Sequence, residues 1–215
     1  NPRIPVRLAS SKNIFEIIEE KDLLVHHPYE SFYTVVEFLN DAAADPDVFT
    51  IKQTLYRFSE DSPIIKALIK AARNGKQVTL IVELKARFDE ENNIKLAKNL
   101  EKSGINIVYG FISLKIHCKI SLVIRKDKNK FKYFTHLSTG NYHFKTARQY
   151  TDLSLFTCSK AIGLDANSLL NFITGSNNLN QGAESYQDKQ SPQLKHLIIS
   201  PFNLRNFINN KINQL

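Results

Sequence analysis

The sequence predicts an α/β fold built on a mixed, mainly parallel β-sheet that is flanked by helices. Strand-like and helix-like segments alternate through residues 48–109, and a β-α-β-α-β order is typical of parallel strands joined by right-handed crossovers. Two further strand-like segments, 115–125 and 131–137, are separated only by a short charged turn, which predicts an antiparallel hairpin. The sheet is therefore expected to contain strands of both directions.

The start of the chain is expected to form an extended entry, a short helix, a strand and a longer helix. Two prolines and the lack of a hydrophobic period argue against a regular element in residues 1–12. A short helix is expected at 13–20, followed by the apolar strand Leu23–His27, which a proline ends. Apolar residues then recur at helical spacing within Tyr29–Ala44, and an Asp-Pro-Asp sequence ends that helix.

The central part of the chain contains the alternating strands and helices. Strands are expected at Val48–Tyr56, Gln77–Leu84 and Ile105–Tyr109. Ser62 followed by Pro63 is typical of a helix start, with an N-cap residue and then a proline at the first helical position, and Gly75 is typical of a helix end. A second helix is expected at Asp89–Ser103, because acidic residues occupy its first turn and Gly104 follows it.

The last part of the chain is expected to add a strand, a helix and a linker. Tyr150–Phe156 is strand-like, and Leu164–Ile173 has the pattern of a helix that a glycine ends. The polar residues 175–192 indicate a linker or loop. Beyond them, Leu194–Ile199 is expected to be a strand, and Ser200-Pro201 is expected to open a final helix.

Composition limits the classes of function. The chain has 215 residues, of which 42% are hydrophobic, and this is enough for one sizeable core. The net charge of +8 favours an anionic partner such as a nucleotide, polyphosphate, nucleic acid or acidic membrane surface.

Two cysteines, Cys118 and Cys158, are too few for a disulfide framework or a zinc site, which predicts a reducing, cytoplasmic location. No apolar run is long enough to span a bilayer, and membrane association is left open. Because the sequence contains no methionine, we expect it to be part of a longer protein.

The segment Leu114–Ile124 contains the main candidates for chemistry. Its polar and apolar residues alternate as in a β-strand, so Lys115, His117 and Lys119 are expected on one face. Two ammonium groups beside an imidazole lower its pKa, favour its neutral and nucleophilic form, and offer a pocket for phosphate. A strand with one solvated face explains the spacing equally well, so the assignment depends on the rest of the chain.

The predicted hairpin brings further polar residues to the same edge of the sheet. Its turn lies at one end, so Lys115–Lys119 and His136–Asn141 are expected side by side at the other end. Arg57 and Arg87 follow the first two parallel strands, and ligands of α/β sheets bind beyond the carboxyl ends of such strands. If the hairpin's first strand runs antiparallel to them, a histidine, several cations and an asparagine gather at one edge.

A His-x-Lys sequence followed by a small-residue turn that ends in asparagine is the outline of one half of a phospholipase D-type site. The matching residues are His117, Lys119 and Ser138–Asn141. In such a site a neutral histidine attacks phosphorus, while lysine and asparagine hold the non-bridging oxygens.

Five blocks of sequence extend the match over nearly the whole chain. They are His26–Phe32, Ile51–Arg57, Val82–Glu91, Leu114–Lys119 and Thr146–Asp152. In order and spacing they closely resemble the polyphosphate kinase family, the bacterial enzymes that make inorganic polyphosphate. The resemblance implies a phospholipase D-like sandwich at 23–175, the first of two such domains at the family's carboxyl terminus. Residues 1–22 would lead out of the family's middle domain, and 176–215 would form a linker and the start of the second sandwich.

The resemblance also implies an activity. The family reversibly transfers the γ-phosphoryl group of ATP to inorganic polyphosphate through a phosphohistidine. The expected substrates are ATP or ADP, with Mg²⁺, and polyphosphate. The expected protein partners are the remaining domains of the same enzyme and, in a homo-oligomer, further copies of it. No nucleic acid partner is expected. Because the family's second histidine lies in the second sandwich, this chain alone is expected to be nearly inactive.

Roles for single residues follow from the matched positions. His117 corresponds to the phosphorylated histidine, with Lys119 as its catalytic partner. Tyr150 corresponds to a nucleotide-binding tyrosine, although an aromatic residue at the edge of the sheet would look the same. Asn141 and Lys115 are expected to help hold the bound phosphates.

Two arginines match positions that the family associates with magnesium and phosphate. They are Arg57 and Arg87. Because arginine is always cationic, they would clamp phosphate oxygens that in turn hold Mg²⁺. The alternative to a phosphate-binding role is that both arginines are solvated charges at strand ends.

Two departures from the pattern leave other functions open. The phospholipase D motif has an aspartate a few residues after its lysine, where this chain has Ile124, and this weakens the hypothesis of a phosphodiesterase or nuclease of that superfamily. The turn begins with Ser138 where the family more often has glycine, which costs backbone freedom. The other alternative is a non-catalytic polyanion-binding module, which only the basic charge supports.

The remaining histidines near the motifs match no catalytic position. We expect His26, His27, His136 and His143 to be packing or surface residues. Cys118 is expected to be a buried apolar residue on the face opposite His117.

Overall fold

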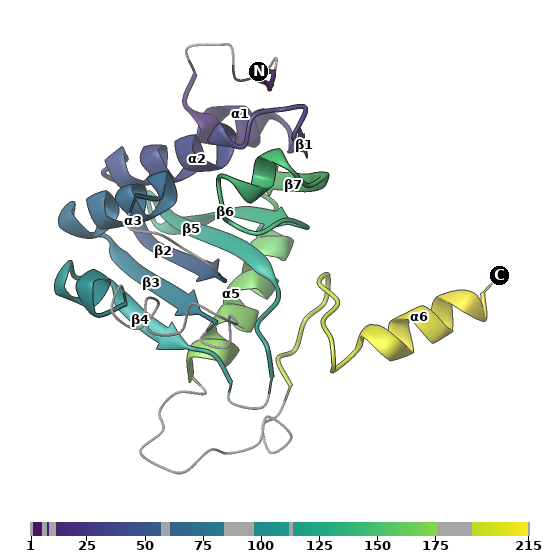
Figure 1. Ribbon diagram of the computed structural model, residues 1–215. Coiled ribbons are helices and arrows are strands. Elements are labelled where there is room, and N and C mark those ends of the chain that lie inside the picture. The colour runs from purple at the N-terminus through teal and green to yellow at the C-terminus, as the bar shows by residue number, and fades with distance from the viewer. Residues whose placement is uncertain are drawn as a thin grey trace.

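The computed structural model describes residues 2–5, 8, 12–56, 61–83, 97–111, 114–175 and 191–214. Within these residues the chain forms one mixed β-sheet of seven strands with helices on both faces (Figure 1). The strands are β1 (Leu23–His27), β2 (Val48–Leu55), β3 (Gln77–Val82), β4 (Asn106–Tyr109), β5 (Lys119–Asp127), β6 (Lys130–Ser138) and β7 (Asp152–Thr157). The helices are α1 (Ile14–Glu20), α2 (Tyr33–Ala44), α3 (Pro63–Arg73), the short 3₁₀ helix η2 (Thr146–Arg148), α5 (Lys160–Gly175) and α6 (Leu204–Ile212). No helix in this described part is long and apolar enough to cross a bilayer.

The strands follow the order β1-β7-β6-β5-β2-β3-β4 across the sheet. β2, β3 and β4 are parallel to one another. The sheet is mixed, as predicted, but it is not mainly parallel, because β5, β6, β7 and β1 all pair antiparallel with their neighbours. The predicted hairpin of β5 and β6 is present, and β5 runs antiparallel to β2.

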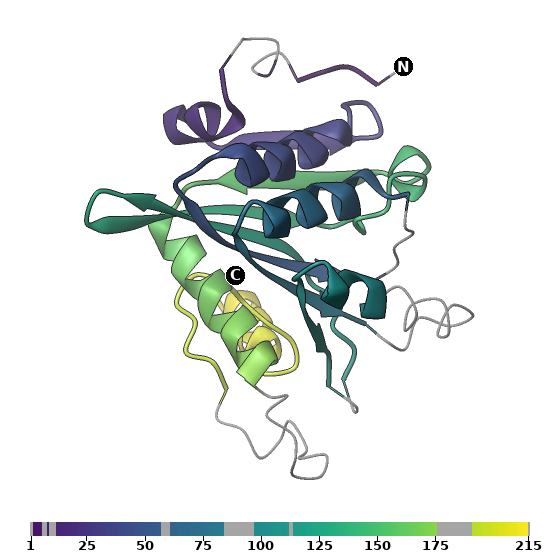
Figure 2. The same cartoon turned by 90° about the vertical axis from the view of Figure 1, so that its left-hand side faces the viewer.

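Different helices cover the two faces of the sheet (Figure 2). α1, α2 and α3 lie on one face, where Val35 and Phe38 of α2 belong to the larger apolar core. α5 covers the other face through residues such as Leu170. Gly163 of α5 lies so close to Tyr133 of β6 that a β-carbon at the glycine would collide with the tyrosine side chain. This close approach lets the helix pack directly on the hairpin.

The predicted helix ends are confirmed. Gly75 and Gly104 follow their helices and have positive φ angles of 79° and 86°, which glycine adopts without steric cost. α3 begins at Pro63 as predicted. Ser62 is the N-cap residue, as predicted, although its hydroxyl makes no capping hydrogen bond.

Several predicted elements differ in extent, among them α5, which begins at Lys160, and β7, which begins at Asp152. α2 begins at Tyr33, because the preceding residues turn the chain from β1 into the helix. Of the helix expected at Asp89–Ser103, residues 97–102 are helical and 89–96 lie outside the described residues. β5 begins at Lys119, which leaves the preceding segment without a strand partner. Of the predicted linker, 176–190 also lie outside the described residues.

After the linker the chain returns to α5 as an irregular segment, here called the return segment (191–203). The prediction of a strand at Leu194–Ile199 is wrong, because three successive N–H groups bond to one carboxylate oxygen instead of to a strand. Oδ2 of Asp165, on α5, accepts from the N–H groups of residues 195, 196 and 197 at 2.9, 2.6 and 2.9 Å. Leu197 packs on the core of the α5 face. α6 begins at Leu204, later than predicted, and projects away from the sheet (Figure 1).

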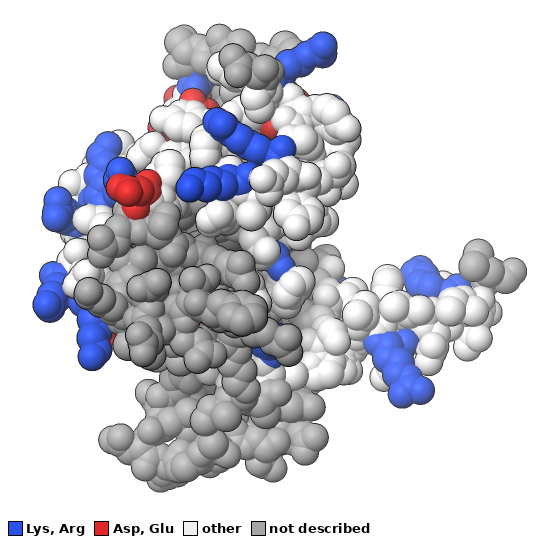
Figure 3. Space-filling model, in the orientation of Figure 1, with Lys and Arg blue, Asp and Glu red and all other residues white. Residues whose placement is uncertain are grey.

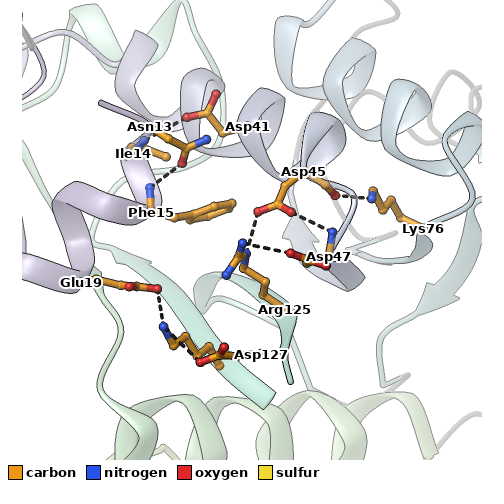
Figure 4. A network of polar contacts seen from close by, with 11 residues as sticks. Asn13, Ile14, Phe15, Glu19, Asp41, Asp45, Asp47, Lys76, Arg125 and Asp127 are labelled. Atoms are coloured by element: carbon orange, nitrogen blue, oxygen red, sulfur yellow. Dashed lines mark hydrogen bonds and ion pairs between the residues drawn. The ribbon is translucent and has the colours of Figure 1, made fainter. Parts of the chain in front are cut away.

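A polar network fixes the end of the sheet at the β5–β6 turn (Figure 4). Arg125 of β5 bonds Asp45 at 2.7 Å and Asp47 at 3.2 Å, just before β2. Lys132 of β6 bridges to Glu19 of α1 at 2.9 Å. Partly exposed ion pairs of this kind contribute about 1 kcal/mol or less each. Their structural effect is to hold the register of the hairpin against β2 and α1.

Replacing Asp165 is expected to release the return segment. Burial opposes ionisation of this carboxyl group, but the three N–H groups outweigh it, so the pKa of Asp165 lies below its usual value. Asp165→Ala should lower the free energy of unfolding by about 3 kcal/mol, because hydrogen bonds to a charged group are worth roughly 1.5–3 kcal/mol each and water replaces part of them. Asp165→Asn keeps one acceptor oxygen and should lose less. Urea unfolding at pH 7 measures both variants.

The sign of the pH dependence provides a second check. Because the pKa of Asp165 is depressed in the folded state, its stabilisation is present above the unfolded pKa and is lost as the pH falls through the folded one. The stability difference between wild type and Asp165→Asn should therefore shrink in acid. If Asp165→Ala were as stable as the wild type, the three hydrogen bonds from the return segment to Asp165 would not stabilise the fold.

Candidate active site

The predicted site edge forms at the open end of the β5–β6 hairpin. β5 and β6 pair over their whole length, and Lys119 lies opposite Ser138. Because β5 runs antiparallel to β2, this end of the hairpin lies at the carboxyl end of β2. The prediction that Lys115–Lys119 and His136–Asn141 lie side by side is confirmed.

β5 separates from β2 just before the site. Their ladder ends at the pair Gln53 and Ser121. The prediction of a strand that begins at Lys115 is therefore wrong for its first residues, because the hydroxyl of Thr54 bonds the chain where the ladder has ended. The opening contains a small cavity lined by residues 54–56, 116–119 and 141–142.

His117 and Lys119 meet at this cavity. Nζ of Lys119 lies 3.1 Å from Nδ1 and 3.2 Å from Nε2 of His117, and it donates to the His117 carbonyl oxygen at 2.6 Å. The Lys119 ammonium lowers the pKa of His117, and burial and Lys115 lower it further. His117 is exposed, whereas Lys119 is only 8% exposed. The edge therefore presents a neutral, accessible imidazole beside a buried cation, which is the form a nucleophile requires.

Serine and threonine hydroxyls build the turn after β6. Gly140 N–H donates to Oγ of Ser138 at 3.0 Å, so the serine caps the turn. Oγ1 of Thr139 donates to Oδ1 of Asp152 at 2.8 Å, and a β-carbon on Gly140 would collide with the same carboxylate. These contacts hold Asn141 at the cavity, where its Oδ1 has no hydrogen-bond partner among the described residues.

Sequence reasoning missed Asp152, which brings a carboxylate to this edge. Burial lowers the pKa of Lys119, and the negative charges of Cys118, when ionised, and Asp152 partly oppose that change. The carboxylate therefore acts on the cation beside the candidate nucleophile. A signal was available, since Asp152 ends the same sequence block as Tyr150 and begins β7.

A buried polar layer lies under the site. Gln53 of β2, Ser121 of β5 and His136 of β6 are adjacent in register and fully buried. Nδ1 of His136 bonds the Tyr142 hydroxyl at 2.7 Å, and its ring lies 4.4 Å from that of Phe156. Burial lowers the pKa of His136 to about 3, so this ring is neutral. His136 is a packing residue, as expected, and it anchors the turn after β6.

The other predicted site residues lie around this centre. Lys115 is exposed, and Tyr150, which is 64% exposed, lies on the loop between η2 and β7. Arg57 and Arg87 lie outside the described residues. Cys118 packs toward the core of the α5 face, and burial raises the pKa of its thiol to about 11.

The remaining histidines take part in local packing and hydrogen bonding. His27 is buried, and its Nε2 lies 2.9 Å from Oγ of Ser154. Nδ1 of His143 accepts from Thr146 N–H at 3.3 Å. The ring of His26 lies against that of Tyr29, with 4.9 Å between their centroids.

Comparisons with known proteins give a consistent result. A family model described as "Polyphosphate kinase C-terminal domain 1" matches residues 13–179. The chain is 49% identical to polyphosphate kinases of Halalkalibacterium halodurans and Bacillus anthracis, over 99% and 95% of its own length but only 28% and 27% of theirs. The crystal structure of polyphosphate kinase from Porphyromonas gingivalis matches with a TM-score of 0.84 and 36% identity, over 100% of this chain and 34% of that one. NucT from Helicobacter pylori matches with a TM-score of 0.52 and 17% identity, over 73% of this chain and 96% of that one, which shows a likeness of fold alone.

The mixed α/β sheet matches the fold of a stretch of the solved polyphosphate kinase, so the fold places the chain among domains of that architecture. The sequence identity identifies the family more specifically than the fold does. The chain belongs to the polyphosphate kinase family and matches the first of its carboxyl-terminal domains. It spans about 28% of the curated relative's length. The family match begins at residue 13, and α1 packs into the same core as the sheet.

Removing one of the two cations near His117 should raise the pKa of its imidazole. Lys119→Met should raise it more than Lys115→Met, because Lys119 is the foremost cause of the lowered value. Methionine keeps an unbranched side chain of similar reach and removes the charge. An NMR titration of the His117 ring measures the change, with the exposed His196 as internal reference. A reversed order, or no rise in either variant, would show that the ammonium of Lys119 does not act on the ring.

Proposed function

We propose that this chain is the part of a polyphosphate kinase that contains the phosphorylated histidine. His117 accepts the γ-phosphoryl group of ATP and passes it to inorganic polyphosphate. The observation that supports this most directly is the approach of Lys119 Nζ to within 3.1 and 3.2 Å of the two ring nitrogens of the exposed His117. The ammonium keeps the ring neutral and also attracts phosphate.

The proposed reaction has two steps. A ring nitrogen of neutral His117 attacks the γ-phosphorus; the N–P bond forms, the bond from that phosphorus to the bridging oxygen breaks, and ADP leaves with the electron pair. A terminal phosphate oxygen of polyphosphate then attacks the phosphohistidine. The N–P bond breaks, the imidazole is restored, and the polyphosphate chain is one phosphate longer. The reverse sequence makes ATP from ADP.

Charge neutralisation and positioning are the main demands of phosphoryl transfer. Lys119 would contact the non-bridging oxygens, assisted by Lys115 and Asn141, and the exposed Tyr150 would contact the nucleotide. Among the described residues on the face in Figure 3, Lys and Arg predominate over Asp and Glu, in line with the net charge of +8. A polyanionic substrate suits such a surface.

Mg²⁺ is expected to enter with the nucleotide and not to occupy a protein site. In the described ranges, no group of three or more His, Cys, Asp or Glu side chains could hold a metal ion. In the proposed complex the phosphates of ATP hold the Mg²⁺. Arg57 and Arg87, outside the described residues, would clamp the same phosphate oxygens.

The complete activity is proposed for the full-length protein. This chain spans about 28% of the curated relative, and we expect the family's second histidine and a further arginine to lie in the second sandwich. The chain alone should be nearly inactive. We propose that the full-length enzyme is a cytoplasmic homo-oligomer that binds ATP and polyphosphate.

The full-length protein should form a phosphohistidine that depends on His117. Incubation with γ-labelled ATP and Mg²⁺ should give acid-labile, base-stable label on wild type and none on His117→Ala, because alanine has no nucleophilic nitrogen. His196→Ala is the matched control, since His196 is exposed on the return segment and should leave the label unchanged. Peptide mapping then locates the modified residue.

The other outcomes of this experiment point to other functions. Equal label on wild type and His117→Ala would move the nucleophile elsewhere and contradict the proposal. No label on either protein, with salt-sensitive polyphosphate binding intact, would favour a polyanion-binding module. Cleavage of a phosphodiester that is lost in His117→Ala would favour a phospholipase D-type phosphodiesterase.

A further inference from the structure

Two buried side chains from neighbouring strands hold the backbone on both sides of His117. Glu83, just after β3, accepts from the N–H of Ile116 through its Oε2 at 2.8 Å. Thr54, near the end of β2, donates from its hydroxyl to the carbonyl oxygen of Cys118 at 2.9 Å. Both side chains are only 3% exposed. The candidate nucleophile therefore lies between two anchored peptide units.

The Thr54 hydroxyl replaces the strand ladder across the opening between β2 and β5. It also accepts from the N–H of Ile120 at 3.0 Å. The ladder stops one residue earlier, at Gln53 and Ser121, so the next buried backbone groups of β5 need another partner. A hydroxyl is both donor and acceptor and can satisfy two such groups at once. β5 thus leaves β2, and the cavity opens, without unpaired buried backbone at that point.

Glu83 and the apolar core fix the residue before His117 in a similar way. A buried carboxylate is unfavourable unless it is hydrogen-bonded, and the Ile116 N–H supplies one such bond. The Ile116 side chain packs in the core of the α5 face and lies so close to Gly110 that a β-carbon there would collide with it. Hydrogen bonding and packing therefore set the path of the chain into His117.

We propose that Thr54 and Glu83 are positioning residues that fix the peptide units on either side of His117 and hold its ring beside Lys119, facing the phosphorus. The inference rests on the proposed role of His117. A misplacement of about 1 Å costs up to about 10²-fold in rate, so loss of either anchor should slow formation of the phosphohistidine.

Substitutions at Thr54 in the full-length protein test the proposal. Thr54→Val keeps the shape and removes the hydroxyl, and single-turnover phosphorylation by ATP should slow about 10- to 100-fold with little change in the KM for ATP. Thr54→Ser keeps the hydroxyl and should restore most of the rate. Thr50→Val is the matched control, because Thr50 is on the same strand, is 6% exposed, and bonds a Gln77 side chain at the other end.

Glu83 provides a second variant in case Thr54→Val folds poorly. Glu83→Leu removes the acceptor and should resemble Thr54→Val. Glu83→Gln keeps an acceptor oxygen but loses the charge, so the rate should fall by only about fivefold. Thermal unfolding of each variant shows how much of any loss comes from stability.

A second measurement does not depend on phosphoryl transfer. Carbethoxylation of His117 as a function of pH, followed by mass spectrometry, reports the pKa of its ring. Thr54→Val should raise that pKa as the ring moves away from Lys119 and Lys115. If the wild type forms no phosphohistidine, the proposed function fails, but this shift still tests the positioning role. A wild-type phosphorylation rate in Thr54→Val, an unshifted His117 profile, or an equal loss in Thr50→Val would overturn the inference.

Discussion

The antiparallel pairing of β5 with β2 is the constraint on which the site depends. β5 enters the sheet between β2 and β6 and runs against the parallel strands, so its first residues lie at the carboxyl end of β2. His117 and Lys119 reach that edge for this reason alone, and β6 returns to it with Ser138 opposite Lys119. The ion pairs of Arg125 lie at the other end of β5 and hold the same register. Because β5 runs opposite to the parallel strands, residues from β2, β5 and β6 meet at this one edge.

The layer directly under Lys119 is polar but uncharged. Gln53, Ser121 and His136 lie there side by side, and His136 stays neutral because burial lowers its pKa to about 3. A charged group at this depth would be costly, and a purely apolar one could not bond the turn after β6. The His136–Tyr142 hydrogen bond joins the strand to that turn at 2.7 Å. The layer separates the buried ammonium from the apolar core of the α2 face and keeps the turn in place.

Local features of the sequence predicted most of the fold, whereas contacts between distant residues decided the rest. Hydrophobic periods, glycines and turn residues are local, and they predicted the alternating strands and helices and the hairpin. Nothing local indicates that a hydroxyl replaces the β2–β5 ladder, because Thr54 and Cys118 are 64 residues apart. The proximity of His117 and Lys119 was predicted correctly, although His117 precedes the strand and Lys119, unlike the exposed His117, is buried at the start of β5. Asp152 was missed although it ends the Thr146–Asp152 block, because a single carboxylate there matched no expected role. The roles of all the predicted site residues, His117 and Lys119 included, remain predictions.

The residue that follows the candidate nucleophile is a cysteine, and its environment has a consequence for reactivity. Burial raises the pKa of the Cys118 thiol to about 11, so at neutral pH only about one thiol in ten thousand is ionised. Oxidants and alkylating reagents react with the thiolate, and sulfur is intrinsically a stronger nucleophile than imidazole nitrogen. Keeping this sulfur protonated leaves the histidine as the reactive neighbour of the two. A protonated thiol is also a poor target for oxidation, so a cysteine can sit next to the candidate nucleophile without competing with it.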